Sequence, residues 1–103
     1  MELTMLTVPA CPSAAAFEGA LAGALADHPG VVVHRREVND EHAAAQAGMH
    51  GSPTLLINGT DPFASPGQPA SMSCRLYRDA TGHPAAAPST EAMRQALAAA
   101  ADD

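Results

Sequence analysis

The stretch of this chain that most constrains its fold reads Ala47-Gly48-Met49-His50-Gly51-Ser52-Pro53-Thr54-Leu55-Leu56-Ile57-Asn58-Gly59. Proline has no backbone N–H and cannot sit in the middle of a β ladder, so a strand is predicted to begin at Thr54 and to end at Ile57. Asn58-Gly59 is a typical turn pair. The stretch therefore predicts a tight turn that leads directly into a short apolar strand.

The segments upstream of this stretch predict a strand, a helix and a second strand. Residues 2–8 carry side chains that suit a strand, and apolar residues recur at helical spacing through residues 12–27. Residues 31–38 begin as an apolar run and end polar. Such a run is typical of a parallel strand that becomes an edge of its sheet.

A short helix is predicted next, with Asn39 or Asp40 as its capping residue and Gly48 as its terminator. Beyond the central stretch, residues 73–78 alternate as a fourth strand, and Ser89 can cap a last helix. The predicted order is β-α-β-α-β-β-α. This order favours an α/β domain with a four-stranded mixed sheet between three helices.

Composition narrows the class of protein. The chain has 103 residues, which suits one domain over 1–103. Eleven acidic residues face five basic ones, giving a formal net charge of -6, and this balance disfavours a nucleic-acid partner. No apolar run is long enough to span a membrane, and the amino-terminal residues do not resemble a signal peptide. We expect a cytoplasmic protein with no membrane partner, whose two cysteines are thiols.

Cys11 directly follows the first predicted strand, and Cys11-Pro12 opens the first predicted helix. A thiolate is the form of cysteine that attacks disulfides, and the positive end of a helix favours that form. The position of Cys11 therefore predicts a reactive thiol. The alternative is a small buried apolar residue, which is a common role of free cysteine.

Two segments together, Cys11-Pro12 and Gly51-Ser52-Pro53-Thr54, resemble the thioredoxin-like superfamily, in which a cis-proline faces a reactive cysteine. The resemblance covers almost the whole chain and implies the thioredoxin-like fold. It also implies a cis Ser52-Pro53 bond, with Pro12, Ser52, Pro53 and Thr54 on the substrate side. The backbone of Ser52 would then pair with an extended substrate. The chain departs from the family's Cys-x-x-Cys motif, because Ala14 stands where the second cysteine would be.

The chain is also similar to small thioredoxin-like proteins of GC-rich bacteria. The shared segments are the Cys-Pro start, the Gly-Ser-Pro-Thr segment, an Asp-Pro-Phe-Ala loop at 61–64 and a Ser-Cys-Arg-Leu-Tyr strand at 73–77. Some proteins of that group carry the label alkylmercury lyase. The label implies soft-metal or organomercurial chemistry of the thiols.

Two further residues are candidates for the site. Cys74 is expected beside Ile57 or Asn58, too far from Cys11 for a disulfide, as either a packed strand residue or a second functional thiol. His50 lies three residues before Pro53 and is a candidate base. The five histidines share no ligand spacing, so no metal site and no cofactor are predicted.

The residues leave several functions open. The first is thiol–disulfide exchange by Cys11 alone, with a protein or a low-molecular-weight thiol or disulfide as partner. The second is a non-catalytic binding module that uses the turn-rich loop at 61–71. The third is soft-metal or organomercurial chemistry, with or without Cys74.

Overall fold

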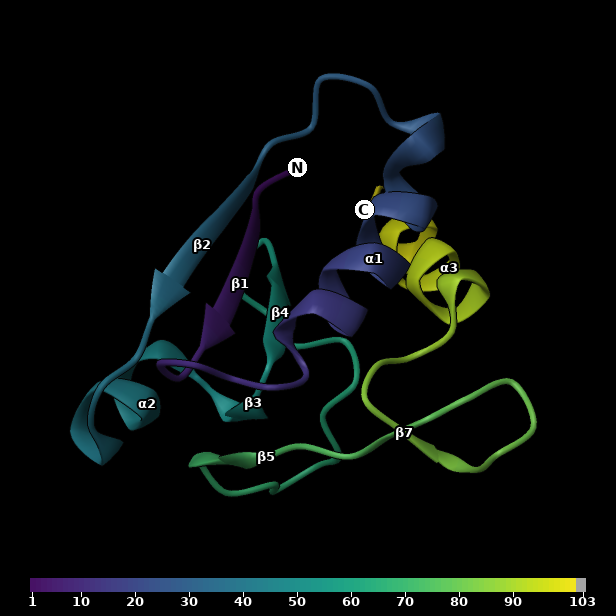
Figure 1. The fold of residues 1–103 in the computed structure, drawn as a ribbon. Coiled ribbons are helices and arrows are strands. Elements are labelled where there is room, and N and C mark those ends of the chain that lie inside the picture. The colour runs from purple at the N-terminus through teal and green to yellow at the C-terminus, as the bar shows by residue number, and fades with distance from the viewer. Residues whose placement is uncertain (102–103) are drawn as a thin grey trace.

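A three-stranded mixed sheet forms the centre of the fold in the computed structural model, which describes residues 1–101 (Figure 1). Its strand order is β2-β1-β4. The central strand β1 (Leu3–Thr7) is parallel to β2 (Val33–Glu37) and antiparallel to β4 (Thr54–Ile57). The predicted strands of the first half of the chain are confirmed, and β2 is an edge strand as its polar end predicted.

Helices cover both faces of this sheet. On one face, α1 (Ala14–Ala24) and α3 (Thr90–Ala101) pack against each other and against β1 and β4. The main core lies between them and consists of Leu3, Met5, Phe17, Leu21, Ala24, Leu55, Ile57, Tyr77, Met93 and Leu97. On the other face, α2 (Glu41–Ala47) covers a smaller core of Leu6, Val38, Ala44 and Met49. The sequence of strands and helices thus gives three layers.

The ends of the helices follow local sequence. Asp40 caps α2, since its carboxylate accepts a hydrogen bond of 2.7 Å from the backbone N–H of Ala43. Gly48 ends this helix with a φ of 78°, a left-handed conformation that glycine adopts freely. Ser89 accepts a hydrogen bond of 3.0 Å from the N–H of Ala92 at the start of α3. The predictions for Asp40, Gly48 and Ser89 are confirmed.

The segment predicted as the fourth strand does not join the main sheet. Instead, β5 (Ser71–Cys74) pairs in parallel with β3 (His50–Ser52), and β6 (Tyr77–Arg78) pairs with β7 (Pro84–Ala85). Within residues 1–101 the structure therefore has three strands in the main sheet and two separate two-stranded ladders. The predicted antiparallel pairing of residues 73–78 with β4 is wrong.

Two buried side chains explain where this segment goes. Arg75 turns inward to Asp61, and Tyr77 turns inward to the carbonyl of Pro53, while Leu76 between them is 73% exposed. Both inward contacts lie near the start of β4 rather than along its length. The segment does alternate between buried and exposed side chains, but the buried ones make these polar contacts and do not pack along the edge of the main sheet.

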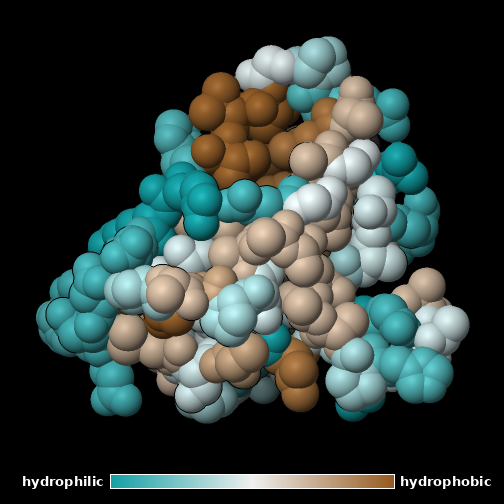
Figure 2. Space-filling view, viewed as in Figure 1, coloured by the Kyte–Doolittle hydropathy of each residue, from teal (hydrophilic) through white to brown (hydrophobic). Residues whose placement is uncertain are grey.

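Polar and apolar residues are unevenly distributed over the surface. Figure 2 shows hydrophilic residues along the side of the molecule where β2 and α2 lie in Figure 1. The exposed large apolar side chains are Met1, Val32 and Leu76. Within residues 1–101, no helix combines the length and the apolar character that a bilayer crossing requires.

Candidate functional site

Cys11 lies in a turn between β1 and α1, ahead of the helix. The helix begins at Ala14 with Ser13 as its N-cap, so the prediction that Cys11-Pro12 opens it is wrong by two residues. The carbonyl of Cys11 accepts a hydrogen bond of 3.2 Å from the N–H of Ala14, which closes the turn. The Cys11 side chain is half-buried, and Pro12 is exposed.

The residue before Cys11 has an unusual backbone. Ala10 has a φ of 56°, in the left-handed region that residues with a Cβ rarely adopt. Such conformations cost free energy and persist where the surrounding contacts hold them. The chain thus turns sharply just before Cys11, and the Ala14 hydrogen bond closes the turn after it.

The Ser52-Pro53 peptide bond is cis, as the resemblance implied. The Ser52 side chain is buried, and its hydroxyl oxygen accepts a hydrogen bond of 3.1 Å from the backbone N–H of Val8. This bond fastens the Ser52-Pro53 segment to the chain three residues before Cys11. The Ser52 hydroxyl therefore serves the backbone of Val8 and not the sulfur of Cys11.

The carbonyl of Ser52 already has a partner within the chain. It accepts a hydrogen bond of 3.1 Å from the N–H of Arg75, and Ser52 pairs with Cys74 in the β3–β5 ladder. A substrate strand was expected to use this backbone. The chain's own β5 occupies that side instead, so the implied pairing of Ser52 with an extended substrate does not fit this structure.

Thr54 holds the turn together from inside. Its hydroxyl donates to the carbonyl of Gly51 at 2.6 Å and accepts from the N–H of His50 at 3.1 Å. Thr54 and Pro53 are both fully buried. The two residues position the site from behind, whereas the resemblance implied contact with substrate.

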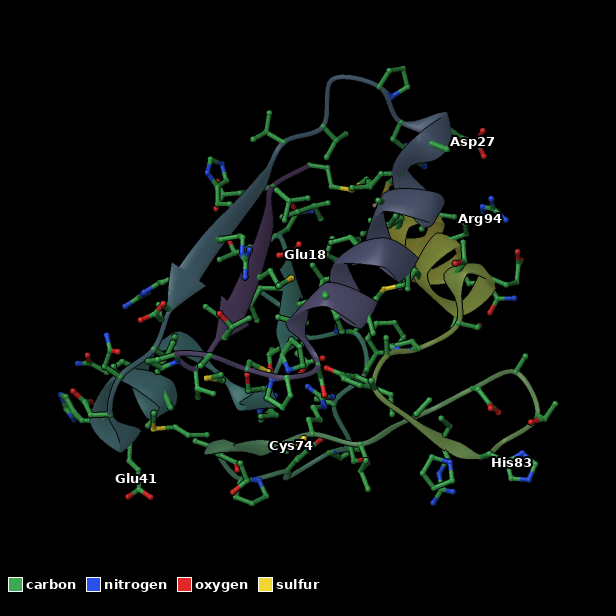
Figure 3. The ribbon with its side chains drawn as sticks, viewed as in Figure 1. Glu18, Asp27, Glu41, Cys74, His83 and Arg94 are labelled. Carbon is green, nitrogen blue, oxygen red and sulfur yellow. The ribbon has the colours of Figure 1, made fainter. Side chains whose placement is uncertain are left out.

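Cys74 lies at the same end of the molecule as Cys11. Its sulfur is 3.9 Å from the hydroxyl oxygen of Ser13, in the turn that carries Cys11, and Figure 3 shows Cys74 on β5. The prediction that Cys74 lies beside Ile57 or Asn58 is wrong, because β5 pairs with β3 and not with β4. Both cysteines are free, and Cys74 is exposed.

A buried polar cluster contacts the Ser52-Pro53 segment and Thr54. One oxygen of Asp61 accepts from Arg75 at 2.6 Å and from Nδ1 of His50 at 2.8 Å. The side chains of Asp61 and Arg75 are only 2% and 6% exposed. Arg75 also donates to the hydroxyl of Thr54 at 3.3 Å. A charged pair this deep is tolerated because each charge has a partner at hydrogen-bond distance.

His50 uses its ring in this cluster. The Asp61 carboxylate can only accept a hydrogen bond, so the Nδ1 atom of His50 carries the proton that it donates. The Nε2 atom of the ring is left for other contacts. His50 was predicted to approach the Cys11 sulfur and act as a base, but its ring contacts a different residue. Its hydrogen bond joins it to Asp61.

Tyr77 completes the cluster. Its hydroxyl donates to the carbonyl of Pro53, and the guanidinium carbon of Arg75 lies 4.6 Å from its ring centre. The ring also packs on Phe17 and Phe63. Burial raises the pKa of the Tyr77 phenol well above its ordinary value, while the nearby Arg75 charge works in the opposite direction.

A cavity of about 690 Å³ opens beside this cluster. Its wall includes His50, Phe63, Cys74, Arg75 and Tyr77, together with the loop residues Ser65 to Pro69. Cys74 lies on this wall, whereas Cys11 is not among its lining residues. Over residues 1–101, no group of three or more acidic, cysteine or histidine side chains is arranged to hold a metal ion.

Asp61, Arg75 and Tyr77 are the site residues that the sequence did not predict. The Asp61-Pro62-Phe63 run is a turn signal, and Asp61 does accept a hydrogen bond of 2.9 Å from the N–H of Phe63 in such a turn. The partners Arg75 and His50 are 14 and 11 residues away. Nothing local in the sequence connects them to Asp61.

Comparisons of the chain with protein-family models, with curated proteins and with solved structures found no match. The fold and the contacts of the described residues therefore carry the functional proposal that follows.

Proposed function

We propose that this chain is a thioredoxin-like protein that carries out thiol–disulfide exchange starting at Cys11. The observation that carries the proposal is the hydrogen bond from the N–H of Val8 to the hydroxyl of Ser52. It fastens the chain three residues before Cys11 to the Ser52-Pro53 segment. A half-buried thiol in a fixed turn beside a second backbone segment is arranged to present one sulfur to an incoming disulfide.

The order and directions of the three central strands support the thioredoxin-like part of the proposal. The first two strands are parallel with a helix between them, and β4 runs antiparallel beside β1. We place the departure from that fold in residues 71–78, which would supply the fourth strand and here fold against β3 and Asp61.

The reaction begins with the thiolate of Cys11. It attacks one sulfur of a disulfide, forms a mixed disulfide with it, and releases the other half as a thiol. The substrate class is a protein disulfide or a low-molecular-weight disulfide. Both cysteines are free thiols, so we place this chemistry in a reducing compartment such as the cytoplasm.

A labelling experiment tests the reactivity of Cys11. In a Cys74→Ser variant, Cys11 is the only thiol, and its rate of alkylation at pH 7 is compared between the folded chain and the chain unfolded in urea. Cys11→Ser, which keeps Cys74, is the matched control. We expect the folded Cys11 to react faster than the unfolded one. A lower rate in the folded chain would mean that Cys11 is a packed apolar residue, and an equal rate would mean that the fold does not activate it; either result would contradict the proposal.

A second candidate function is a non-catalytic binding module. The observation that favours it is the cavity of about 690 Å³, whose wall is built partly by the loop at residues 65–69. A ligand held there would contact the loop without using Cys11. Labelling separates the two functions, because a binding module gives no reason for Cys11 to react faster when folded.

A further inference from the structure

We propose that Cys74 is the resolving thiol of this site, supplied by β5 where the local sequence after Cys11 has none. Because Cys74 acts on the mixed disulfide that Cys11 forms, its role rests on the proposed function. Three observations support it: the Ser13 contact, the pairing of β5 with β3, and the open wall on which Cys74 lies.

The first observation is the contact between the two segments that carry cysteines. The Sγ atom of Cys74 is 3.9 Å from Oγ of Ser13. Ser13 and Cys11 belong to one turn, closed by the hydrogen bond from Ala14 to the Cys11 carbonyl. The Cα atoms at the two ends of such a turn lie less than about 7 Å apart. Cys74 therefore faces the Cys11 turn and not a distant part of the fold.

The second observation is that β5 is held in this position by several bonds. Cys74 is the register partner of Ser52, and the N–H of Arg75 donates to the Ser52 carbonyl at 3.1 Å. The Arg75 side chain is then anchored by Asp61 at 2.6 Å. Cys74 thus stands next to an anchored residue, on the strand attached to the Ser52-Pro53 segment.

The third observation is the accessibility of Cys74. It is exposed and lies on the wall of the cavity of about 690 Å³. A disulfide that reaches this wall meets the Cys74 thiol, and the contact of Cys74 with Ser13 joins the wall to the turn that bears Cys11. A resolving thiol needs this access, because it must reach the mixed disulfide while the second half of the substrate leaves.

The chemistry balances in two exchanges. The Cys11 thiolate attacks a substrate R–S–S–R, forming the Cys11–S–S–R bond and releasing R–S⁻. The Cys74 thiolate then attacks the Cys11 sulfur, forming a Cys11–Cys74 disulfide and releasing the second R–S⁻. The two protons of the cysteine thiols end on the two released thiolates. The substrate disulfide is the oxidant, and an external thiol returns the chain to its reduced form.

The test follows the mixed disulfide by intact-mass spectrometry after mixing the reduced chain with bis(2-hydroxyethyl) disulfide. In the unaltered chain, we expect the adduct to be replaced by the Cys11–Cys74 disulfide, which is lighter than the reduced chain by two hydrogen atoms. In Cys74→Ser the adduct should persist at least about tenfold longer, because a thiol held beside the disulfide acts at millimolar effective concentration or above.

A matched control keeps the number of thiols constant. Cys74→Ser combined with Asp27→Cys moves the second thiol to the end of the molecule opposite Cys74, as Figure 3 shows. We expect this variant to behave like Cys74→Ser. An adduct that lives equally long in the unaltered chain and in Cys74→Ser would overturn the proposal.

The same experiment at pH 9 separates this inference from the proposed function. Ordinary thiols are largely ionised at that pH, since their pKa is about 8.5, so Cys11 forms the adduct whether or not the fold activates it. If the adduct forms slowly at pH 7 but is resolved rapidly in the separate experiment at pH 9, the result would count against the activation of Cys11 only. Adducts that persist at pH 9 in the unaltered chain would count against Cys74.

Discussion

The sulfur of Cys74 lies 3.9 Å from the hydroxyl oxygen of Ser13, although the two residues are 61 positions apart in the chain. Ser13 belongs to the turn that carries Cys11, and Cys74 belongs to the strand that pairs with Ser52. The contact therefore joins the three segments of the candidate site. Its geometry is the first thing to test, because the roles of both cysteines depend on it.

A designed cysteine at position 13 measures this contact directly. In a Cys11→Ser background, Ser13→Cys is expected to form a disulfide with Cys74 under mild oxidation, since its sulfur would replace an oxygen already in contact. Intact mass and non-reducing peptide maps detect the bond. Asp27→Cys in the same background is the control, because Asp27 and Cys74 lie at opposite ends of the molecule in Figure 3. Equal disulfide yields in the two variants would argue against the contact.

Gly51 is expected to tolerate no side chain. Its φ is 115°, and a Cβ added there would lie 2.8 Å from Cβ of Arg75. Gly51→Ala should lower the free energy of unfolding by about 1–3 kcal/mol or more from the backbone conformation alone. Gly19→Ala is the matched control, since it meets nothing within 4 Å on α1 and should raise stability by about 0.5–1 kcal/mol. Urea denaturation measures the free energy of unfolding of both variants. Similar effects of the two changes would contradict the close approach of β5 to Gly51.

The ion pair of Asp61 with Arg75 is expected to stabilise the fold only as a pair. Asp61→Asn leaves the buried guanidinium without a counter-charge and should lower the free energy of unfolding by about 3–5 kcal/mol. Glu18→Gln removes the carboxylate of the exposed pair with Arg35 and should cost less than about 1 kcal/mol. Comparable losses in the two variants, measured in urea, would mean that Asp61 is not buried with Arg75.

Tyr77 gives a direct reading of pH dependence, because it is the only tyrosine and the chain has no tryptophan. Burial raises the pKa of its phenol above the ordinary value of 10.0. The raised pKa adds stability that is fully present below pH 10 and is lost as the pH rises through the folded value. Ultraviolet absorbance should show no phenolate near pH 10 while the chain stays folded.

The comparison variant for this pH dependence is Tyr77→Phe. It removes the hydrogen bond to the Pro53 carbonyl and should cost about 1–2 kcal/mol at neutral pH. Above pH 10 its stability should fall less steeply than that of the unaltered chain, since it has no phenol to ionise. A folded chain whose tyrosine ionises freely at pH 10 would contradict the burial of Tyr77.

Local signals in the sequence predicted much of the fold. The caps Asp40 and Ser89 and the terminator Gly48 act through bonds to neighbouring residues, so they can be read without a structure. The start of β4 after Pro53 follows in the same way from the missing N–H of proline. These features depend on contacts a few residues away.

The partner of residues 71–78 could not be predicted in this way. Alternation divides the side chains between two faces, but it does not give the strand that they meet. The outcome was decided by Arg75, whose burial requires a carboxylate, and Asp61 is that carboxylate. Because this pairing spans 14 residues, the position of Cys74 beside Ser52 followed from it and not from the strand pattern.

Catalysed exchange between a small disulfide and a small thiol tests the central claim most directly. At pH 7, with bis(2-hydroxyethyl) disulfide and excess reduced glutathione, the rate is measured against protein concentration for the unaltered chain and for Cys11→Ser. We predict a rate that rises in proportion to the unaltered chain and stays at the uncatalysed level for Cys11→Ser. Equal rates for the two proteins would contradict the assignment of thiol–disulfide exchange to Cys11.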